Sequence, residues 1–430
     1  MRYITDFHLH TKYSRATSKY LGLEELTRWA HIKGLEILGT SDFTHPKWFA
    51  EIREKFEPAG EGLYTIKKEF LNTADIPMSV VDRPFFFMLT SEVSCIYSKG
   101  GKVRRLHILL AFPSLEDVEA FNARLTARGA KLASDGRPIL GMDAKDVAAI
   151  GFDVSEHALV IPAHAWTPWF AIFGSKSGFD SIEECYEELA DRIYAVETGL
   201  SSDPPMNWRM KDMQTRFVIS NSDAHSGPKI GREANIFELA KPSYFAIFDA
   251  LKNHDAKTFL ETIEFYPEEG MYHYDGHRKC GVRMHPDQTK KEKGLCPKCK
   301  LPVTVGVLSQ VEKLAAFPAG HTPANVPSHR YLVPLPEILS EVYGKGWQTQ
   351  TVQNAYFDLI KKGGDEFHLL LDMPVAEIRD IGGDILATAI EKMRAGDLAI
   401  EPGYDGVYGT VKIFKPGELE RLQPKQQSLL

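Results

Sequence analysis

The sequence predicts an α/β protein: a seven-stranded β/α barrel, then a small cysteine-rich module, then a mostly helical segment. Three observations lead to this fold class. Seven β-rich apolar runs occupy the chain up to about residue 230, helical patterns separate several of them, and the runs end in histidine, acid or amide residues. Strands that alternate with helices favour a parallel sheet.

The predicted strands cover residues 3–10, 35–43, 85–94, 104–112, 159–165, 193–199 and 217–225. Helical patterns occur before the second run, at "GLEELTRWAHIKG", and after the fourth, at "SLEDVEAFNARLTARG". In a closed β/α barrel the loops after the strands form one face, so side chains far apart in sequence meet there.

Polar side chains occur at or near the ends of all seven predicted strands. They are His8, His10, Asp42, Glu92, His107, His164, Glu197, Asp223 and His225. Imidazole and carboxylate ligands suit zinc, manganese or iron in a multinuclear hydrolytic centre. One such histidine alone is more often a hydrogen-bonded core residue, but this many at corresponding positions indicates a metal site.

The motifs "DFHLH", "TSDFTH", "SEVS", "LHILL", "PAHA" and "SNSDAH" resemble the polymerase-and-histidinol-phosphatase (PHP) domain over residues 1 to about 255. That family has a distorted seven-stranded barrel with a phosphoesterase site of two or three metals. The resemblance implies roles for eight of the residues above. His8, His10 and Asp223 would bind the first metal, His107 and His164 the second, Glu92 would bridge them, His225 would lean towards a third, and Asp42, Glu92 and Asp223 would be catalytic.

The sequence departs from the family pattern after Asp42, where Phe43 replaces a histidine. His45 could substitute as a ligand, or Asp42 could act as a general base or orient a ligand. Glu197 is either a ligand or an anchor of its loop. We therefore expect two well-held divalent ions, of zinc, manganese, magnesium or iron, and a weak or absent third.

Three of the five cysteines form a second candidate metal site. Cys280, Cys296 and Cys299 with His277 give the spacing H-x2-C-x15-C-x2-C, which is typical of four-ligand structural zinc. His273 and His285 compete with His277 for the fourth position. Because Cys95 and Cys185 are widely separated, the cysteines suit an intracellular metal site better than a disulfide framework.

The cysteine-rich segment is strongly basic. Between residues 277 and 300 eight lysines and arginines face two acids, about +6 in a chain whose net charge is -7. A basic knob beside a phosphoesterase site indicates contact with a phosphate backbone, although an ordinary solvated loop is the alternative.

The motifs "GHRKC", "GLCPKC", "HRYLVPLPEIL" and "GYDGVYG" extend the similarity over nearly the whole chain, which resembles the endonuclease Q family. This resemblance implies a DNA repair endonuclease that cuts 5′ to deaminated bases (uracil, hypoxanthine, xanthine) and abasic sites, leaving a 3′-hydroxyl and a 5′-phosphate. The alternatives are a PHP-type phosphatase of a small phosphomonoester and a non-catalytic DNA or clamp adaptor. Candidate aromatic residues for stacking on an opened strand, or for core packing, are Phe43, Trp48, Trp166, Trp169 and Phe170.

The expected division of the chain is residues 1–258 for the PHP barrel, 259–305 for the zinc-binding module, 306–420 for a mostly helical domain and 421–430 for a tail. The tail resembles short peptides that bind sliding clamps, with Gln426, Ser428, Leu429 and Leu430 as the contacts. Because no long uncharged apolar run occurs, we expect a soluble, cytoplasmic protein.

Overall fold

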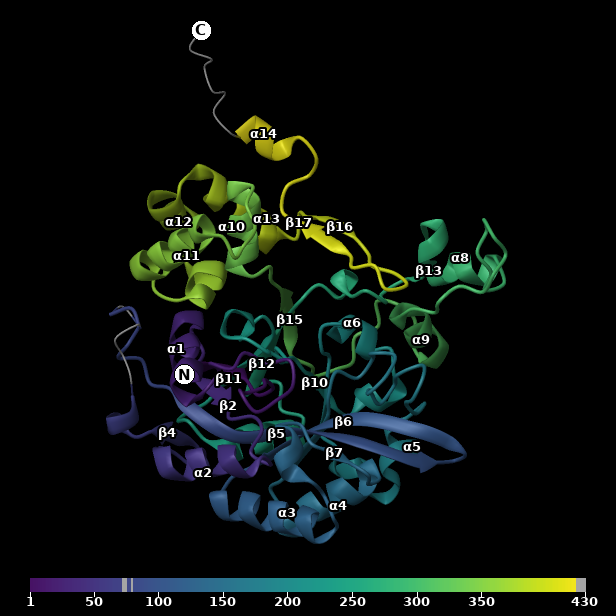
Figure 1. The fold of residues 1–430 in the computed structure, drawn as a ribbon. Coiled ribbons are helices and arrows are strands. Elements are labelled where there is room, and N and C mark those ends of the chain that lie inside the picture. Colours follow the sequence, from purple (N-terminus) through teal and green to yellow (C-terminus); the bar gives the residue numbers. More distant parts are fainter. Residues whose placement is uncertain (72–75, 79, 423–430) are drawn as a thin grey trace.

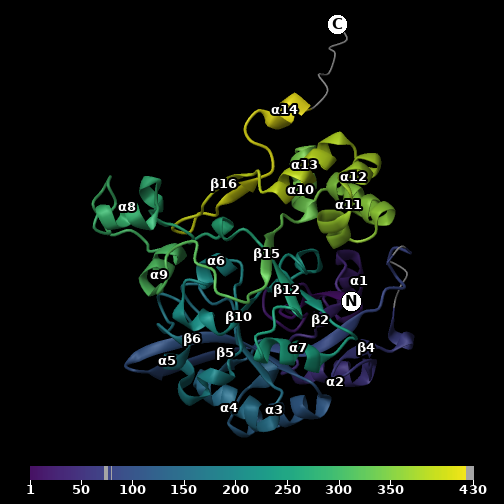
Figure 2. The same cartoon turned by 180° about the vertical axis from the view of Figure 1, so that it is seen from behind.

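The computed structural model of the chain describes residues 1–71, 76–78 and 80–422. A sheet-containing body carries two further groups of elements, a helical group above the N-terminus and a small module on the other side (Figure 1). The view from behind shows the same two groups joined by a long hairpin (Figure 2). No described helix combines the length and the apolar character that a membrane span requires.

The body is built on an eleven-stranded sheet. Eight strands follow the order β15-β12-β11-β1-β2-β5-β4-β3, and in addition β6 and β7 pair with β5, and β8 pairs with β6. All seven predicted runs contain a strand. These strands are β1 (Arg2–Asp6), β2 (Ile37–Gly39), β5 (Phe86–Lys99), β6 (Lys102–Phe112), β8 (Leu159–Pro162), β9 (Ala195–Glu197) and β10 (Phe217–Ile219). The other members of the sheet are β3 (Phe56–Pro58), β4 (Tyr64–Ile66), β7 (Ile139–Leu140), β11 (Ala234–Glu238), β12 (Phe259–Glu264) and β15 (Ser328–Tyr331).

The prediction of a parallel sheet is right for β1–β2, β2–β5 and β9–β10 and wrong for β5–β6, β6–β8 and β1–β11, which are antiparallel. The turn between β5 and β6 explains one reversal, because Gly100 and Gly101 have φ values of 61° and 73° and connect the strands as a hairpin. Within the described residues β9 and β10 form a sheet of their own. The closed seven-stranded barrel is therefore not confirmed, whereas the mixed α/β class is.

Helices cover the body where apolar residues recur at helical spacing. In α3 (Leu115–Ala127), Val118, Phe121 and Leu125 are buried on one face, and Ser114 caps the helix by accepting a hydrogen bond from the Asp117 N–H. The other helices of the body are α1 (Leu23–Lys33), α2 (Pro46–Lys55), α4 (Ala144–Val154), α5 (Ile182–Tyr186), α6 (Pro204–Asn207) and α7 (Tyr244–Lys252). This packing fixes the strands whose ends and faces carry the polar residues.

The small module contains β13 (Asp275–His277), β14 (Val282–Met284) and α8 (Pro286–Lys291). Its own apolar core is small: Val282, Met284, Cys296 and Val303. A core of this size needs another source of stability, such as a metal ion.

Helices make up most of the regular structure in the C-terminal segment. They are α9 (Val307–Leu314), α10 (Leu335–Tyr343), α11 (Gln350–Gly363), α12 (Val375–Gly382) and α13 (Asp384–Ala395), followed by the hairpin strands β16 (Ala399–Glu401) and β17 (Thr410–Lys412) and by α14 (Glu418–Leu422). Between α9 and α10, β15 pairs in parallel with β12, so this segment also completes the edge of the main sheet.

The turn of the C-terminal hairpin, residues 402–409, reaches back to the small module; we call this segment the clasp (Figure 2). The Gly403 carbonyl accepts a hydrogen bond from the Tyr274 N–H at 2.9 Å. The carboxylate of Asp405 accepts from the Arg278 N–H and from the Thr304 hydroxyl, both at 2.6 Å. The module is therefore anchored by the chain that enters it, the chain that leaves it and the clasp.

Candidate metal centre

Glu92 and His107 lie on neighbouring strands and not at strand ends as predicted. In the antiparallel register Ser94 pairs with His107, so Glu92, two residues from Ser94, lies on the same face as His107. His107 Nδ1 is 2.8 Å from Glu92 Oε1. His164, from the loop after β8, brings its Nε2 to within 3.1 Å of the same oxygen and 3.0 Å of His107 Nδ1.

A second group forms where the loops after β1 and β10 meet. The His10 N–H donates to the Ala224 carbonyl at 2.8 Å, which fixes the two loops side by side. His10 Nε2 is then 3.0 Å from Asp223 Oδ1. It is also 3.3 Å from Glu92 Oε2, and His8 Nε2 is 3.5 Å from that oxygen.

Glu92 therefore belongs to two groups of potential ligands, one through each carboxylate oxygen. The groups are His8, His10, Glu92 and Asp223, and Glu92, His107 and His164, each with ligand atoms within 4.8 Å of one another. A shared carboxylate between two ligand sets is the arrangement that a two-metal centre requires.

The donor chemistry fits divalent ions. His8 Nε2 is buried and finds no hydrogen-bond partner among the described residues, although it faces the carboxylates of Glu92 and Asp223. A buried polar nitrogen without a partner is costly, and a metal ion would satisfy it. The mixture of imidazole and carboxylate suits zinc, manganese or iron.

Glu197 anchors the centre and is not one of the clustered ligands. Its two oxygens lie 3.0 Å from His8 Nδ1, so the other ring nitrogen points towards Glu92. It also accepts hydrogen bonds from the His164 N–H at 2.8 Å and the Asn221 amide at 2.9 Å. Of the two alternatives that the sequence left open, this geometry favours an orienting contact.

Asp42 holds the loop that carries His10. Its Oδ2 accepts hydrogen bonds from the Thr11 N–H at 2.8 Å, the Thr11 hydroxyl at 2.6 Å and the Ser14 hydroxyl at 2.8 Å. Burial alone would raise the pKa of Asp42, but the bond to His10 and the donors of Thr11 hold it below its ordinary value. These contacts favour the orienting role over that of a general base.

The two further histidines lie outside both groups. His45 precedes α2 and stacks on Tyr13, with ring centroids 4.3 Å apart. His225 lies beside His10, with ring centroids 4.4 Å apart, and its Nδ1 is 3.0 Å from the Asp223 carbonyl oxygen. His225 therefore borders the centre, whereas His45 is not brought to the other predicted ligands.

The electrostatics of the centre favour an ionised Glu92. Burial opposes its ionisation, but the nearby His107 and Arg137 keep the pKa of Glu92 well below its usual value. Burial lowers the pKa of His107 to about 4, so this imidazole is neutral at physiological pH and can act as a ligand.

Arg137 was not predicted from the sequence. Its Nη1 lies 3.0 Å from Glu92 Oε2, and the residue comes from the loop before β7. A single arginine in "SDGRPIL" matches no motif, and no local pattern in the sequence could have identified it.

Four residues around the centre have left-handed backbone conformations. The φ values are 53° for Ser41, 48° for Asp42, 30° for His164 and 46° for Asp223. Such conformations cost free energy in residues other than glycine and concentrate at functional sites. The tight loops around the ligands are therefore held by their surroundings.

Three of the five candidate aromatic residues are core residues and cannot stack on a ligand. Phe43, Trp48 and Trp166 are fully buried. Phe170 packs on His107, with ring centroids 4.8 Å apart. Trp169 remains accessible, with 43% of its surface exposed.

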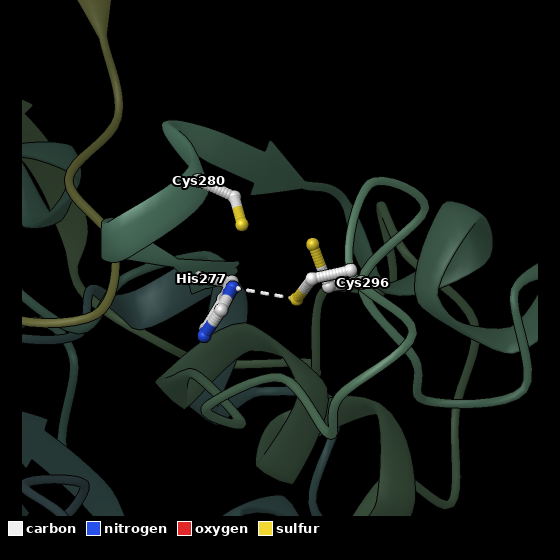
Figure 3. A group of neighbouring side chains, drawn as sticks. His277, Cys280 and Cys296 are labelled. Carbon is white, nitrogen blue, oxygen red and sulfur yellow. Dashed lines mark hydrogen bonds between the residues drawn. The ribbon is translucent and has the colours of Figure 1, made fainter.

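The cysteine-rich module brings its four predicted ligands together. Figure 3 shows the side chains of His277, Cys280 and Cys296 converging, and His277 Nδ1 lies 3.4 Å from Cys299 Sγ. All four ligand atoms lie within 4.8 Å of one another. Burial opposes ionisation of Cys296, but the N–H groups of Cys299 and Lys298 lower its pKa to about 6. One histidine and three cysteines are the donors that structural zinc sites use.

The two competing histidines are engaged elsewhere. His285 caps α8 by accepting from the Asp287 N–H. His273 stacks on Tyr274 with ring centroids 5.3 Å apart, and burial lowers its pKa to about 4. The geometry therefore favours His277 as the fourth member of the set.

The chain is similar in sequence to a family model and to two known proteins. The family model described as the MJ0043 C-terminal domain matches residues 334–397. The chain is 34% identical over 264 residues to the uncharacterized protein MJ0043 of Methanocaldococcus jannaschii, which covers 60% of this chain and only 32% of that protein. It is 28% identical over 420 residues to the uncharacterized protein YqxK of Bacillus subtilis, covering 95% of this chain and 98% of that protein.

Two solved structures that match the whole chain are endonucleases of the Q type, and the chain is similar to both in fold. One is PfuEndoQ from Pyrococcus furiosus, described as a lesion-specific endonuclease, with a TM-score of 0.83, 28% identity and coverage of 100% of this chain and 98% of that one. The other is endonuclease Q in complex with a 27-mer duplex that has an abasic lesion at the active site, with a TM-score of 0.82, 29% identity and full coverage of both chains. The resemblance to the endonuclease Q family is therefore confirmed over the full length of the chain.

Proposed function

We propose that the protein is a metal-dependent, lesion-specific DNA endonuclease. The observation that carries this proposal is Glu92, whose two oxygens face two separate ligand groups in a chain that matches endonuclease Q over its full length. The DNA-bound relative, which holds a duplex with an abasic lesion, supports DNA as the substrate.

In this proposal His8, His10 and Asp223 would hold one ion, His107 and His164 would hold a second, and Glu92 would contribute to both sets. The ions would acidify a bound water and neutralise charge on the phosphoester oxygens. The chain itself supplies the positioning: Glu197 fixes the ring of His8, and Asp42 fixes the loop of His10. Both carboxylates are fully buried, so water does not compete for these two contacts.

We further infer that the bond cut lies 5′ to a deaminated base, namely uracil, hypoxanthine or xanthine, or to an abasic site, and that the products are a 3′-hydroxyl and a 5′-phosphate. Chemistry at such a site requires the lesion nucleotide to leave the stack, which costs least where pairing is already weak. Trp169 is the accessible aromatic candidate for contact with the opened strand.

The basic module, residues 259–305, would hold one structural zinc ion through His277, Cys280, Cys296 and Cys299 and contact the DNA backbone. Residues 1–258 would form the phosphoesterase unit and residues 306–420 an accessory unit. The clasp supports joint action of the accessory unit and the basic module, because it belongs to the accessory unit and is hydrogen-bonded to the module.

One assay tests the function. The protein is incubated with Mg²⁺ or Mn²⁺ and with duplexes that carry uracil, hypoxanthine, an abasic site or no lesion, and the cut is mapped. Cutting 5′ to the lesions alone supports the proposal. Equal cutting of undamaged DNA, or no cutting of any duplex, contradicts it.

The predicted clamp contacts Gln426, Ser428, Leu429 and Leu430 lie outside the described residues. They remain a hypothesis based on sequence. Deletion of residues 426–430 would abolish binding to a sliding clamp if the hypothesis holds, while lesion cutting by the isolated protein would be unchanged.

A further inference from the structure

The metal centre contains a cationic side chain that neither ligand group explains. Arg137 Nη1 lies 3.0 Å from Glu92 Oε2, the oxygen that also faces His8 and His10. Among the described lysines and arginines, Arg137 is the one that forms an ion pair with a carboxylate of the two groups. Its side chain is 27% exposed, so it reaches the centre from a partly open side.

The loop that delivers Arg137 is fixed against the centre. The Gly136 N–H donates to the Tyr13 carbonyl at 2.9 Å, and the Ser94 N–H donates to the Pro138 carbonyl at 3.0 Å. Gly136 has no room for a side chain, because a Cβ there would lie 2.3 Å from Asp42 Oδ2. The backbone of Arg137 is therefore fixed on both sides, and its guanidinium is held by the contact with Glu92, unlike that of a free surface arginine.

Arg137 is expected to give up its ion pair with Glu92 when Glu92 coordinates metal ions. A carboxylate that coordinates divalent ions has little negative charge left for a guanidinium, and like charges only a few ångströms apart repel strongly in a buried site. Arg137 would then turn to another anion beside Glu92. A phosphodiester bound for cleavage is such an anion, and the planar fork of arginine matches the oxygens of a phosphate group.

We propose that Arg137 binds a non-bridging oxygen of the phosphate that is cut. The inference rests on the proposed endonuclease function and adds a substrate contact to it. Without the ions and the DNA, the same side chain pairs with Glu92. The guanidinium thus has one partner before the centre is loaded and another afterwards.

The test compares two abasic duplexes that differ only at the phosphate 5′ to the lesion, which is either an ordinary phosphodiester or a neutral methylphosphonate. Binding of each is measured with Ca²⁺ for the natural chain, Arg137→Gln and Arg137→Lys. If Arg137 contacts this phosphate, the preference of the natural chain for the charged duplex falls by roughly 10-fold or more in Arg137→Gln, since hydrogen bonds to charged groups are among the strongest. Arg137→Lys, which keeps the charge and loses the fork, retains part of the preference.

Arg124→Gln is the matched control. Arg124 lies on α3, is 48% exposed and pairs with Asp153, so its variant should keep the full preference. Metal content and thermal unfolding of Arg137→Gln show whether the variant is folded and loaded.

The outcomes separate this inference from the function on which it rests. An unchanged preference in folded Arg137→Gln, or equal weakening of both duplexes, overturns the contact while lesion cutting by the natural chain still supports the endonuclease. Failure of the natural chain to bind or cut lesion DNA overturns both.

Discussion

Both carboxylate oxygens of Glu197 lie 3.0 Å from His8 Nδ1, and one of them also accepts the backbone N–H of His164 at 2.8 Å. One buried side chain thus holds a member of each ligand group around Glu92. The two groups are therefore positioned relative to each other by a residue that belongs to neither.

This arrangement predicts that Glu197→Gln weakens the metal centre. An amide cannot offer two negative oxygens to His8, and loss of such an orienting partner usually costs 10- to 100-fold in metal affinity or activity. Metal content after dialysis against a weak chelator measures the effect. Glu156→Gln, at a side chain 86% exposed, is the control, and equal metal retention in both variants would contradict the role given to Glu197.

Asp223→Ala should abolish lesion cutting and leave DNA binding within a few-fold of the natural value. Asp223 contributes the oxygen nearest to His10 Nε2, at 3.0 Å, so its loss removes a ligand from the centre and leaves the basic module untouched. Cleavage and binding are measured on the same abasic duplex. Asp153→Ala, at a side chain 73% exposed, should behave like the natural chain. A cleaving Asp223→Ala variant would show that the centre works without this residue.

Cys296→Ala should release the zinc of the module without emptying the other centre. Cys296 is both a member of the four-ligand set and part of the module's small apolar core, so the region should also become sensitive to protease. Zinc analysis and limited proteolysis between residues 278 and 300 check this. Cys185→Ala removes a buried cysteine elsewhere and should keep the full zinc content; a similar loss there would argue against a specific site.

Stability should fall as the pH rises from 7 to 9 because of two buried acids, Glu233 and Glu264. Three of their four carboxylate oxygens have no hydrogen-bond partner among the described residues. Burial raises the pKa of Glu264 to about 8. An acid whose pKa is raised by folding stabilises the protein below its unfolded pKa, and this contribution is lost as the pH passes the folded value.

Glu264→Gln should therefore flatten this dependence by about 1 kcal/mol of unfolding free energy between pH 7 and pH 9. Denaturant unfolding at several pH values measures the slope. The exposed variant Glu156→Gln should keep the natural slope, and an unchanged slope in Glu264→Gln would mean that this carboxyl is already ionised at neutral pH.

The strands and most members of the clustered side-chain groups could be predicted because each depends on a short local pattern. Strand direction could not, since it depends on connections such as the Gly100–Gly101 turn and on pairing with β11, beyond the predicted runs. Glu197 could be placed near the centre but not assigned a partner, because its contact with His8 joins residues 189 positions apart. Arg137 was missed for the same reason, because its place in the centre depends on its contact with Glu92, which is distant in the sequence.

The clasp, residues 402–409, comes later in the chain than the module that it anchors. Proteins emerge from the ribosome N-terminus first, so His277 and the three cysteines are available to bind zinc long before Asp405 exists. The module can fold early as a metal-bound unit, whereas the contacts of the clasp form only after residues 402–409 have been made. A chain that stopped before residue 402 would contain both sets of candidate ligands and would lack the contacts of Asp405 that anchor the module.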